Sequence, residues 1–344
     1  MFFKGVLVIK YSLAKIAKEL GVSKSTVSFV LNGKASTARI SADMEKRILD
    51  FCKEVNYVPN IHAQRINRKF AGNIGFLVKQ SVLVDIDNPF ADYNISSIMG
   101  GIVLTAESYG CRVSVQLYNE NMDENRVFDW LRSNEIDSLI YYGVEMPARW
   151  KKIFAEEKRC VAGIGIMPDK NISSVNIDNF SASYDLTKIL IGKGRTKFLY
   201  ISGNDGSFVS DERKNGFYSA CKENGIDVSN IEFITAYYSE SKAREIVSNY
   251  NTNNIDAIVC ANDDMALGAL KALREKGISV PEKIAVVGGD NIVLGRYFSP
   301  SLTTFDNMQY ELGKAAVECV VDMSNGEREK TIIIPTKVIL RESL

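Results

Sequence analysis

The chain has 344 residues, of which 46% are hydrophobic and 24% are charged, and this fits a soluble globular protein of two or three domains. Its formal net charge is zero, which by itself argues against a nucleic-acid partner. The charges are unevenly distributed, because residues 1–70 hold 13 basic and 5 acidic residues while the rest hold 29 and 37. A basic head on an acidic body is typical of attraction to a phosphate backbone, and a solvated charged helix face is the alternative.

Cysteine and histidine usage excludes several kinds of site. Six cysteines lie far apart, at positions 52, 111, 160, 221, 260 and 319. We interpret them as reduced core residues, neither a disulfide framework nor metal ligands. The single histidine, His62, argues against histidine-based metal sites and Ser-His or Cys-His nucleophile pairs. The apolar start, residues 2–9, is interrupted by Lys4 and is too short to span a membrane, so we expect a cytoplasmic protein.

The first seventy residues predict three short helices, over about residues 13–20, 24–31 and 42–56. A serine that can cap the helix precedes each of them, namely Ser12, Ser23 and Ser41. Gly21 tolerates the turn between the first two helices. Two short helices at a glycine turn with a supporting third predict a helix-turn-helix, and a plain three-helix bundle is the alternative.

The sequence of this region carries a family resemblance. The run SLAKIAKELGVSKSTVSFVLNGK, then RIS, then VNYVPNIHAQRI, closely resembles the DNA-binding headpiece of the lactose/galactose repressor (LacI/GalR) family. The similarity includes the family's Gly-Val-Ser turn, its Thr-Val-Ser helix, Asn-Gly at the end of that helix, and Tyr-x-Pro-Asn before the hinge. The resemblance implies a transcriptional regulator that reads double-stranded DNA.

The resemblance implies a set of DNA-contacting residues, which are Ser12, Leu13, Ser23, Lys24, Ser25, Thr26, Ser28, Phe29, Asn32, Tyr57, Asn60, Ala63 and Ile66. The resemblance implies that base-reading positions are held by Lys24, Ser25 and Phe29. It implies that phosphate contacts, which set the register, come from Ser12, Ser23, Thr26, Ser28 and Asn32, together with Tyr57. Many family members have arginine at the position of Phe29. Phenylalanine offers only apolar contact, for instance to a thymine methyl, so we predict a half-site that relies less on guanine there.

Residues 59–69 resemble the hinge of the same family. Ala63 and Ile66 match the residues that approach the minor groove, with Ile66 as the wedge that opens a base step. A helix of this length is marginal in isolation. The resemblance therefore implies a hinge helix that folds on DNA, paired with its dimer mate.

The rest of the chain alternates short apolar runs with helix-like segments. The candidate strands are Ile74–Val78, Arg112–Tyr118, Ser138–Tyr142, Val161–Ile166, Lys197–Ser202, Glu232–Ala236, Ala257–Ala261 and Ile284–Gly288. Such βαβ repetition predicts an α/β fold with doubly wound parallel sheets. The number of strands favours two lobes, with a ligand cleft outside the carboxyl ends of the strands. The repetition alone is equally compatible with a two-domain enzyme.

Three stretches, DERKNGF, CANDDMALGALKAL and VPEKIAVVGGDN, resemble the periplasmic-binding-protein-like effector domain of the same family. The resemblance places Arg213, Asn262 and Asp290 in the ligand cleft. A guanidinium, an amide and a carboxylate together suit a polyol. We interpret Asp263 and Asp264 as helix caps, and a structural salt bridge is the alternative role of Arg213 and Asp290.

Three further residues complete the predicted effector site. Tyr238, or its neighbour Tyr237, lies where the family often has an aromatic stacked on the ligand. Phe90 matches the family's Asn-Pro-Phe loop, with extra residues after it that shift the register. Lys79 follows the first strand, and a lysine there would favour a phosphorylated or acidic sugar.

The predicted organisation is a helix-turn-helix headpiece at 11–58, a hinge at 59–70, and an effector-binding and dimerisation domain at 71–344. We expect its first lobe over about 71–172 and 305–330, and its second over about 173–304 and 331–344. A helix is predicted at 308–323, and a last strand at 331–334 that continues through Pro335 to Leu340. No heptad tail follows in the sequence, so a dimer is expected.

These features predict a dimeric transcriptional regulator, in the family's usual mode a repressor, that binds an inverted-repeat operator. A small polar effector, a sugar or sugar derivative, would control it. A regulator that senses a purine or another metabolite is the alternative, and the headpiece disfavours a sugar-binding transport protein. We expect no enzyme activity, cofactor or metal, because the sequence lacks a Walker loop, a Gly-x-Ser-x-Gly elbow, a metal cluster and a dinucleotide fingerprint.

Overall fold

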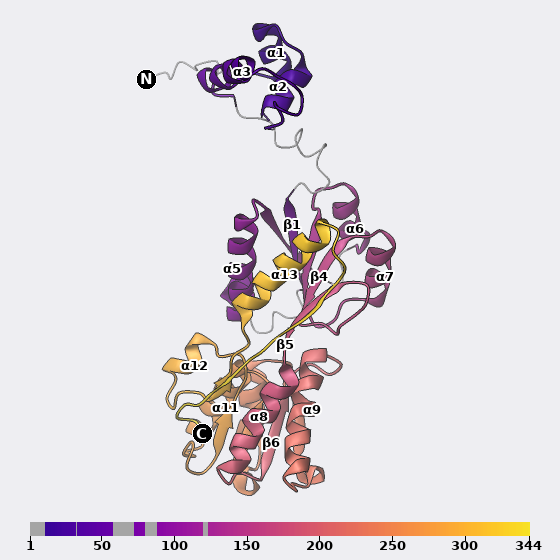
Figure 1. Cartoon of the computed structure of the whole chain (residues 1–344). Helices are drawn as coiled ribbons and strands as arrows, with labels where there is room; N and C mark the ends of the chain where they lie inside the picture. Colours follow the sequence, from indigo (N-terminus) through magenta and orange to yellow (C-terminus); the bar gives the residue numbers. More distant parts are fainter. Residues whose placement is uncertain (1–10, 32, 58–71, 80–87, 120–122) are drawn as a thin grey trace, which may run out of the picture. The chain divides into compact units, whose positions relative to one another are not determined.

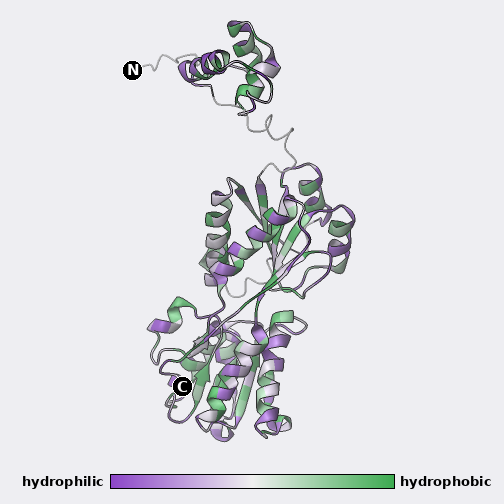
Figure 2. Ribbon diagram, in the orientation of Figure 1, coloured by the Kyte–Doolittle hydropathy of each residue, from purple (hydrophilic) through white to green (hydrophobic). Residues whose placement is uncertain are grey.

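The computed structural model describes residues 11–31, 33–57, 72–79, 88–119 and 123–344. The chain divides into two compact units, Met1–Lys69 and Phe70–Leu344 (Figure 1). Each unit has its own hydrophobic core. Figure 2 shows apolar residues along the strands and polar residues on the outward faces of the helices.

The first unit contains the three predicted helices, α1 (Leu13–Leu20), α2 (Lys24–Leu31) and α3 (Ala42–Glu54). Ser12 Oγ accepts a hydrogen bond from the backbone N–H of Lys15 at 3.3 Å, and Ser23 Oγ accepts one from Thr26 at 3.0 Å. Gly21 ends α1 in the left-handed conformation with φ 68°. The caps and the glycine turn confirm the predicted helix-turn-helix.

Every helix of this unit contributes to one core. Ile16 of α1, Val27 of α2 and Ile48 of α3 are completely buried. Leu20 and Cys52 are also buried beside them. Because the apolar side chains of α2 face this core, its opposite face is left for other contacts.

The second unit begins with a lobe built on a six-stranded parallel sheet in the order β11-β5-β4-β3-β1-β2. Its strands are β1 (Asn73–Lys79), β2 (Arg112–Tyr118), β3 (Ser138–Tyr142), β4 (Cys160–Ile164), β5 (Ser173–Ile177) and β11 (Thr331–Ile334). Its helices are α5 (Tyr93–Ser108), α6 (Asn125–Arg132), α7 (Ala148–Glu156) and α13 (Gln309–Ser324), with the short 3-10 helix η2 (Pro89–Ala91) before α5. Helices α5 and α13 cover one face of the sheet and α6 and α7 the other (Figure 1).

The second lobe is built on a four-stranded parallel sheet in the order β7-β6-β8-β9. Its strands are β6 (Phe198–Ser202), β7 (Glu232–Thr235), β8 (Ala257–Cys260) and β9 (Ala285–Val287). Its helices are α8 (Asn179–Gly192), α9 (Phe208–Glu223), α10 (Glu240–Asn249), α11 (Asp263–Glu275) and α12 (Val293–Tyr297). A small antiparallel pair, β10 (Thr304–Phe305) with β12 (Val338–Ile339), lies after them in the chain. The two faces of the four-stranded sheet pack in separate clusters, as in a doubly wound fold.

The chain passes between the lobes after β5, after β10 and after β11, and this corrects the expected lobe boundaries. Strand β5 pairs with β4 and with β11, so residues 173–177 and 331–334 belong to the first lobe. The expected boundaries at 172/173 and 330/331 are therefore wrong. The strand expected to run through Pro335 is two strands, β11 and β12, in different sheets. Proline has no N–H to donate to a ladder, so a break there is unsurprising.

Strand β5 escaped prediction because its sequence, SSVNI, is half polar. All five residues are buried. Asn176 Nδ2 donates to the carbonyl of Ile166 at 3.0 Å, and Ser173 Oγ accepts from the backbone N–H of Lys330 at 3.1 Å. These partners remove most of the cost of burying the polar groups, so hydropathy does not reveal the strand.

Helices α5 and α13 cross at two glycines. A Cβ atom added at Gly101 would overlap the carbonyl oxygen of Tyr310, and one added at Gly313 would overlap that of Ile98. The helix axes can be this close only because neither residue has a side chain.

We expect Gly101→Ala to lower the free energy of unfolding by about 1–3 kcal/mol, because the helices must separate. Urea unfolding followed by tryptophan fluorescence measures this, since Trp130 and Trp150 both lie in the first lobe. Gly100→Ala is the matched control, because a Cβ at Gly100 meets no atom within 4 Å. The control should be neutral or slightly stabilising, and equal losses in the two variants would contradict the crossing argument.

The six cysteines are free thiols; Cys52, Cys221, Cys260 and Cys319 are buried, as predicted for core residues, whereas Cys111 and Cys160 are only half-buried. Within the parts of the chain that the structure describes, no helix is both long enough and apolar enough to cross a bilayer.

Candidate functional site

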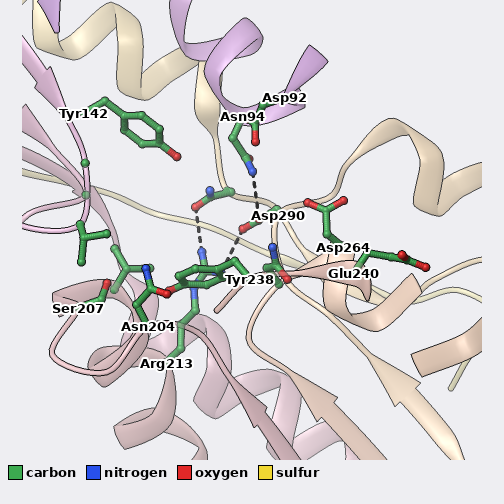
Figure 3. Close-up of a pocket in the computed structure, with 16 residues that line it drawn as sticks. Asp92, Asn94, Tyr142, Asn204, Ser207, Arg213, Tyr238, Glu240, Asp264 and Asp290 are labelled. Carbon is green, nitrogen blue, oxygen red and sulfur yellow. Dashed lines mark hydrogen bonds and ion pairs between the residues drawn. The ribbon is translucent and has the colours of Figure 1, made fainter. Parts of the chain in front are cut away.

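A cavity of about 350 Å³ lies within the Phe70–Leu344 unit, with walls from both lobes (Figure 3). It is lined by Asp92, Asn94, Tyr142, Gly143, Val144, Gly165, Asn204, Ser207, Val209, Arg213, Tyr238, Glu240, Asn262, Asp264, Asp290 and Asn307. Many of these residues lie at or just after the carboxyl ends of β3, β4, β6, β7, β8 and β9. Parallel α/β sheets bind ligands at this edge, so the cavity is the candidate ligand site.

Arg213, on α9, is buried at the floor of this cavity and is held from several directions. Its Nε donates to Asn179 Oδ1 at 2.9 Å, and its Nη2 donates to Asn307 Oδ1 at 3.2 Å. Its Nη1 donates both to the carbonyl of Ala261 and to Asp290 Oδ1, the latter at 3.1 Å. The guanidinium is therefore fixed in position before any ligand arrives, which lowers the entropic cost of binding.

Asp290 follows β9 and is held in a left-handed conformation with φ 123°. Its Oδ1 accepts from Arg213, and its Oδ2 accepts from Asn94 Nδ2 of the first lobe at 3.3 Å. Burial raises the pKa of Asp290, and the adjacent Arg213 opposes that rise. Arg213 and Asp290 thus form the buried salt bridge that was the alternative to ligand contact, and both also line the cavity.

Asn262 lines the cavity as expected, whereas the two aspartates after it have roles that differ from the prediction. Asn262, not an aspartate, is the N-cap of α11, because its Oδ1 accepts from Met265 N at 3.0 Å. Asp263 instead accepts from the backbone N–H of Ile292 at 2.9 Å and from Thr304 Oγ1 at 2.6 Å. Asp264 lines the cavity. The capping interpretation of the aspartates is therefore wrong, and Asn262 both caps the helix and borders the cavity.

Tyr238 is the tyrosine of the Tyr237–Tyr238 pair that lines the cavity. Tyr237 is 53% exposed. The ring of Tyr238 lies against Gly203, where a Cβ atom would overlap it, so a glycine at this turn after β6 is what admits the ring. The Tyr238 hydroxyl is buried beside the side chains of Ser207 and Ser210 and makes no hydrogen bond of good geometry with a described residue. A ligand oxygen could therefore complete its hydrogen bonding.

The structure does not bring Lys79 and Phe90 to the cavity. Lys79 lies two residues after Leu77 on β1, so its side chain starts on the sheet face that carries α6 and α7. Phe90, in η2, has a side chain that is 49% exposed. Asp92, which directly follows η2, lines the cavity instead.

Sequence reasoning missed most of the polar lining, including Asp92, Asn94, Asn204, Glu240 and Asp264. Each lies at the start of a helix or in the turn after a strand. These residues could have been found from their positions directly after predicted strands or at the starts of the following helices. The turns after parallel strands converge on one edge of a sheet, where ligands bind. The side chains reach the cavity from α5, α10, α11 and the β6–α9 turn.

The surroundings of Asp264 disfavour its ionised form. Burial, together with Asp290, Asp92 and Glu240, raises the pKa of Asp264 to about 7. Burial also raises the pKa of Asp92, although two backbone N–H groups lower it. The cavity is therefore a region in which negative charge is crowded and poorly solvated.

Several of the predicted DNA-contacting residues lie on or beside α1 and α2 at the surface of the headpiece. Lys24, Ser25 and Phe29 are exposed, and Phe29 presents 43% of its surface to solvent. Ser12 and Ser23 are exposed at the helix starts, where their hydroxyls also serve as caps. Of the other predicted residues, Leu13 and Tyr57 pack in part against the core, whereas Thr26 and Ser28 are half-buried on α2. Asn32, Asn60, Ala63 and Ile66 lie outside the described residues.

We expect Phe29→Arg to change base preference at one position of each half-site toward guanine, because arginine can bond the O6 and N7 edge bidentately. Selection of operators from a randomised duplex library measures the preference of the wild type and the variant. Lys18→Arg, an exposed change on α1, is the control and should leave every position unchanged. Identical preferences of the wild type and the Phe29→Arg protein would contradict the base-reading role of this position.

Both units match known families. Residues 12–60 match the bacterial regulatory proteins of the lacI family. Residues 187–344 match the periplasmic binding protein-like domain.

Relatives match over nearly the whole chain. The HTH-type transcriptional regulator RegA of Clostridium saccharobutylicum is 29% identical over 341 residues, covering 96% of this chain and 98% of RegA. A structure of the lac repressor dimer bound to operator and the anti-inducer ONPF has a TM-score of 0.82 at 22% identity, with 97% of this chain and 98% of that chain covered. A complex of the transcriptional regulator CelR with cellobiose has a TM-score of 0.72 at 22% identity, with 97% and 100% covered.

A helix-turn-helix unit followed by a two-lobed domain with a polar cavity defines the class of ligand-responsive, DNA-binding transcriptional regulators. The chain combines a DNA-binding domain of the lacI family of bacterial regulatory proteins with a periplasmic binding protein-like domain, and its relatives over nearly the whole chain are transcriptional regulators. These matches confirm the predicted fold and the prediction of a regulator rather than an enzyme.

Proposed function

We propose that this regulator acts as a homodimer in the cytoplasm, represses genes from an inverted-repeat operator, and is controlled by a sugar bound in the cavity between its lobes. The observation that carries the proposal is the polar lining of that cavity, with Arg213 and Asp290 at its floor. Oriented carboxylates, amides and a guanidinium can pair with adjacent hydroxyls of a pyranose. The cellobiose complex of the structural neighbour CelR supports a sugar as the ligand class.

The cavity favours a sugar over a purine. Four amides line it, Asn94, Asn204, Asn262 and Asn307, together with four carboxylates. Only two of the described lining residues, Tyr142 and Tyr238, are aromatic, so groups that can pair with hydroxyls outnumber rings that can stack on a base. The carboxylates also disfavour the phosphorylated or acidic sugar that Lys79 suggested from sequence, because like charges would be buried together.

Exposed apolar residues support the homodimer. On α5, Val103 and Leu104 face solvent, and Leu104 is 56% exposed. The opposite side of this helix packs on α13, so the outward face has no partner within the described chain. On α12 of the second lobe, Leu294 and Tyr297 are exposed, the latter by 81%. Apolar groups exposed this far on both lobes are typical of a protein–protein interface.

The contacts of Asp290 supply a route from ligand to lobe arrangement. Asn94, at the start of α5, bonds Asp290 of the second lobe, and Gln309 Nε2 donates to Asn94 Oδ1 at 2.7 Å and to the carbonyl of Asp290 at 2.8 Å. A ligand hydroxyl that donates a hydrogen bond to Asp290 would compete with Asn94 for this carboxylate. It would therefore weaken the contact between α5 and the second lobe. Differential affinity of the ligand for two lobe arrangements is what allosteric control requires.

Isothermal titration calorimetry of the full chain with a panel of neutral monosaccharides, disaccharides, sugar phosphates and purines tests the ligand class. We expect one neutral or amino-substituted sugar family to bind, and Asn262→Ala to weaken it at least tenfold. Binding of a purine alone would overturn the sugar and favour the purine-sensing alternative. Binding of no compound would contradict the assignment of the cavity as a small-metabolite site.

A further inference from the structure

The cavity carries more negative charge than its own residues neutralise. Asp92, Glu240, Asp264 and Asp290 line it, and Arg213 is the one cationic side chain among the described residues that do so. Arg213 is already paired with Asp290 at 3.1 Å. The other three carboxylates, which we call the acidic corner, therefore have no counter-charge among the described residues that line the cavity.

The acidic corner is assembled from three helix starts. Asp92 is the N-cap of α5 and accepts from the backbone N–H of Ile95 at 2.8 Å. Glu240 is the first residue of α10, and its nearest cation, Lys271, is 3.9 Å away. Asp264, in the first turn of α11, has neither a hydrogen bond nor an ion pair with any described residue. Figure 3 shows Asp264 beside Glu240, with Asp92 entering from the other lobe.

Helix dipoles do not remove this excess. A helix N-terminus is equivalent to roughly +0.5 of an elementary charge, so three of them offset about half of three carboxylates. Burial, and after it the charges of Asp290, Asp92 and Glu240, raises the pKa of Asp264, so its carboxylate form lacks a stabilising partner among the described residues. The described residues include no group of three or more acidic, cysteine or histidine side chains arranged to hold a metal ion. A positive charge that balances the acidic corner would therefore have to come from the ligand.

We propose that the effector is a cationic sugar, an amino sugar or a closely similar polyhydroxylated amine, whose ammonium group lies against Asp264 in the acidic corner. This inference rests on the proposed sugar-sensing function and names its ligand class. The hydroxyl groups face Asp290, Arg213 and the amides, and the ammonium takes the place of a counter-ion that the chain does not supply. Hydrogen bonds between ionised partners are roughly twice as strong as neutral ones, so this contact sets specificity.

Calorimetry with matched pairs of ligands tests the inference on the full-length protein. Each pair differs by one group, hydroxyl or ammonium: glucose and glucosamine, galactose and galactosamine, mannose and mannosamine, and cellobiose and its analogue with one amino group in place of one hydroxyl. We expect the amino member of the recognised pair to bind at least tenfold tighter near pH 7. N-acetylglucosamine, which is neutral at the same position, should lose the advantage.

Asp264→Asn isolates the charge, because the amide keeps the shape of the side chain. It should reduce the amino-to-neutral affinity ratio to about one while the neutral sugar binds within about threefold of its former affinity. Asp211→Asn is the matched control, since Asp211 is exposed in the first turn of α9 and does not line the cavity. This control should leave the ratio unchanged.

The outcomes separate the inference from the function on which it rests. Equal or tighter binding of the neutral members overturns the cationic ligand and leaves sugar sensing intact. An affinity ratio that survives Asp264→Asn overturns the role of the acidic corner. Failure of every neutral and amino sugar to bind overturns sugar sensing itself, and the inference falls with it.

Discussion

Arg213→Ala is expected to destabilise the second lobe by about 3–5 kcal/mol, because it leaves Asp290 buried without its cation. The same change should abolish detectable effector binding, since the floor of the cavity loses both the guanidinium and the fixed position of Asp290. Urea unfolding of the full chain measures the first effect, and calorimetry with the recognised sugar measures the second. A variant as stable as the wild type would show that the pair makes no net contribution to stability.

The pH dependence of this loss has a definite sign. Arg213 lowers the pKa of Asp290, so its removal raises the folded-state pKa further above the unfolded value. A carboxyl group whose pKa is raised on folding destabilises the fold above the unfolded pKa, and the penalty shrinks as the pH falls toward that value. The loss should therefore be larger at pH 8 than at pH 5. The double variant Arg213→Met with Asp290→Asn, which has no unpaired charge, should recover much of it at pH 8.

Leu104→Arg is expected to convert the dimer to a monomer and to weaken operator binding by about 10²–10⁴-fold. Arginine on the exposed face of α5 places like charges opposite each other across a two-fold axis. Two headpieces held together bind the second half-site at a high effective concentration, and a monomer loses that gain. Sedimentation velocity reports the oligomeric state, and fluorescence anisotropy with an inverted-repeat duplex reports affinity.

Ile333→Arg supplies the control, because Ile333 is an exposed apolar residue on β11, away from α5 and α12. It should leave both the dimer and the operator affinity unchanged. Affinity for a single half-site should be the same for the wild type and Leu104→Arg. A Leu104→Arg protein that remains dimeric at micromolar concentration would place the interface elsewhere.

The fold was largely predictable because its signals are local. The caps Ser12 and Ser23 and the turn at Gly21 fix the headpiece within a few residues, and most strands of the body are apolar runs between helices. Strand β5 is different, because its buried serines find hydrogen-bond partners near residue 330 and its buried asparagine finds one at Ile166. Because β5 was not predicted, residues 173–177 and their partner strand at 331–334 were assigned to the wrong lobe.

The site was less predictable because it depends on which groups meet in space. Arg213, Asn262, Tyr238 and Asp290 were identified through motifs, and all four line the cavity. Asp264 was interpreted as a cap because it lies in the first turn of a helix. Only the convergence of three helix starts on one edge shows that it faces other carboxylates, and no single stretch of sequence contains that information.

The central claim is that ligand in the cavity and operator on the headpiece are energetically coupled. The most direct test is an anisotropy titration of the full-length dimer with its selected operator, with and without a saturating concentration of the sugar found by calorimetry. We predict a change in operator affinity of about 5–150-fold, the range of ordinary allosteric coupling, and no change in Asn262→Ala at the same sugar concentration. An operator affinity that is identical with and without bound sugar would contradict the account, because a ligand without differential affinity cannot control DNA binding.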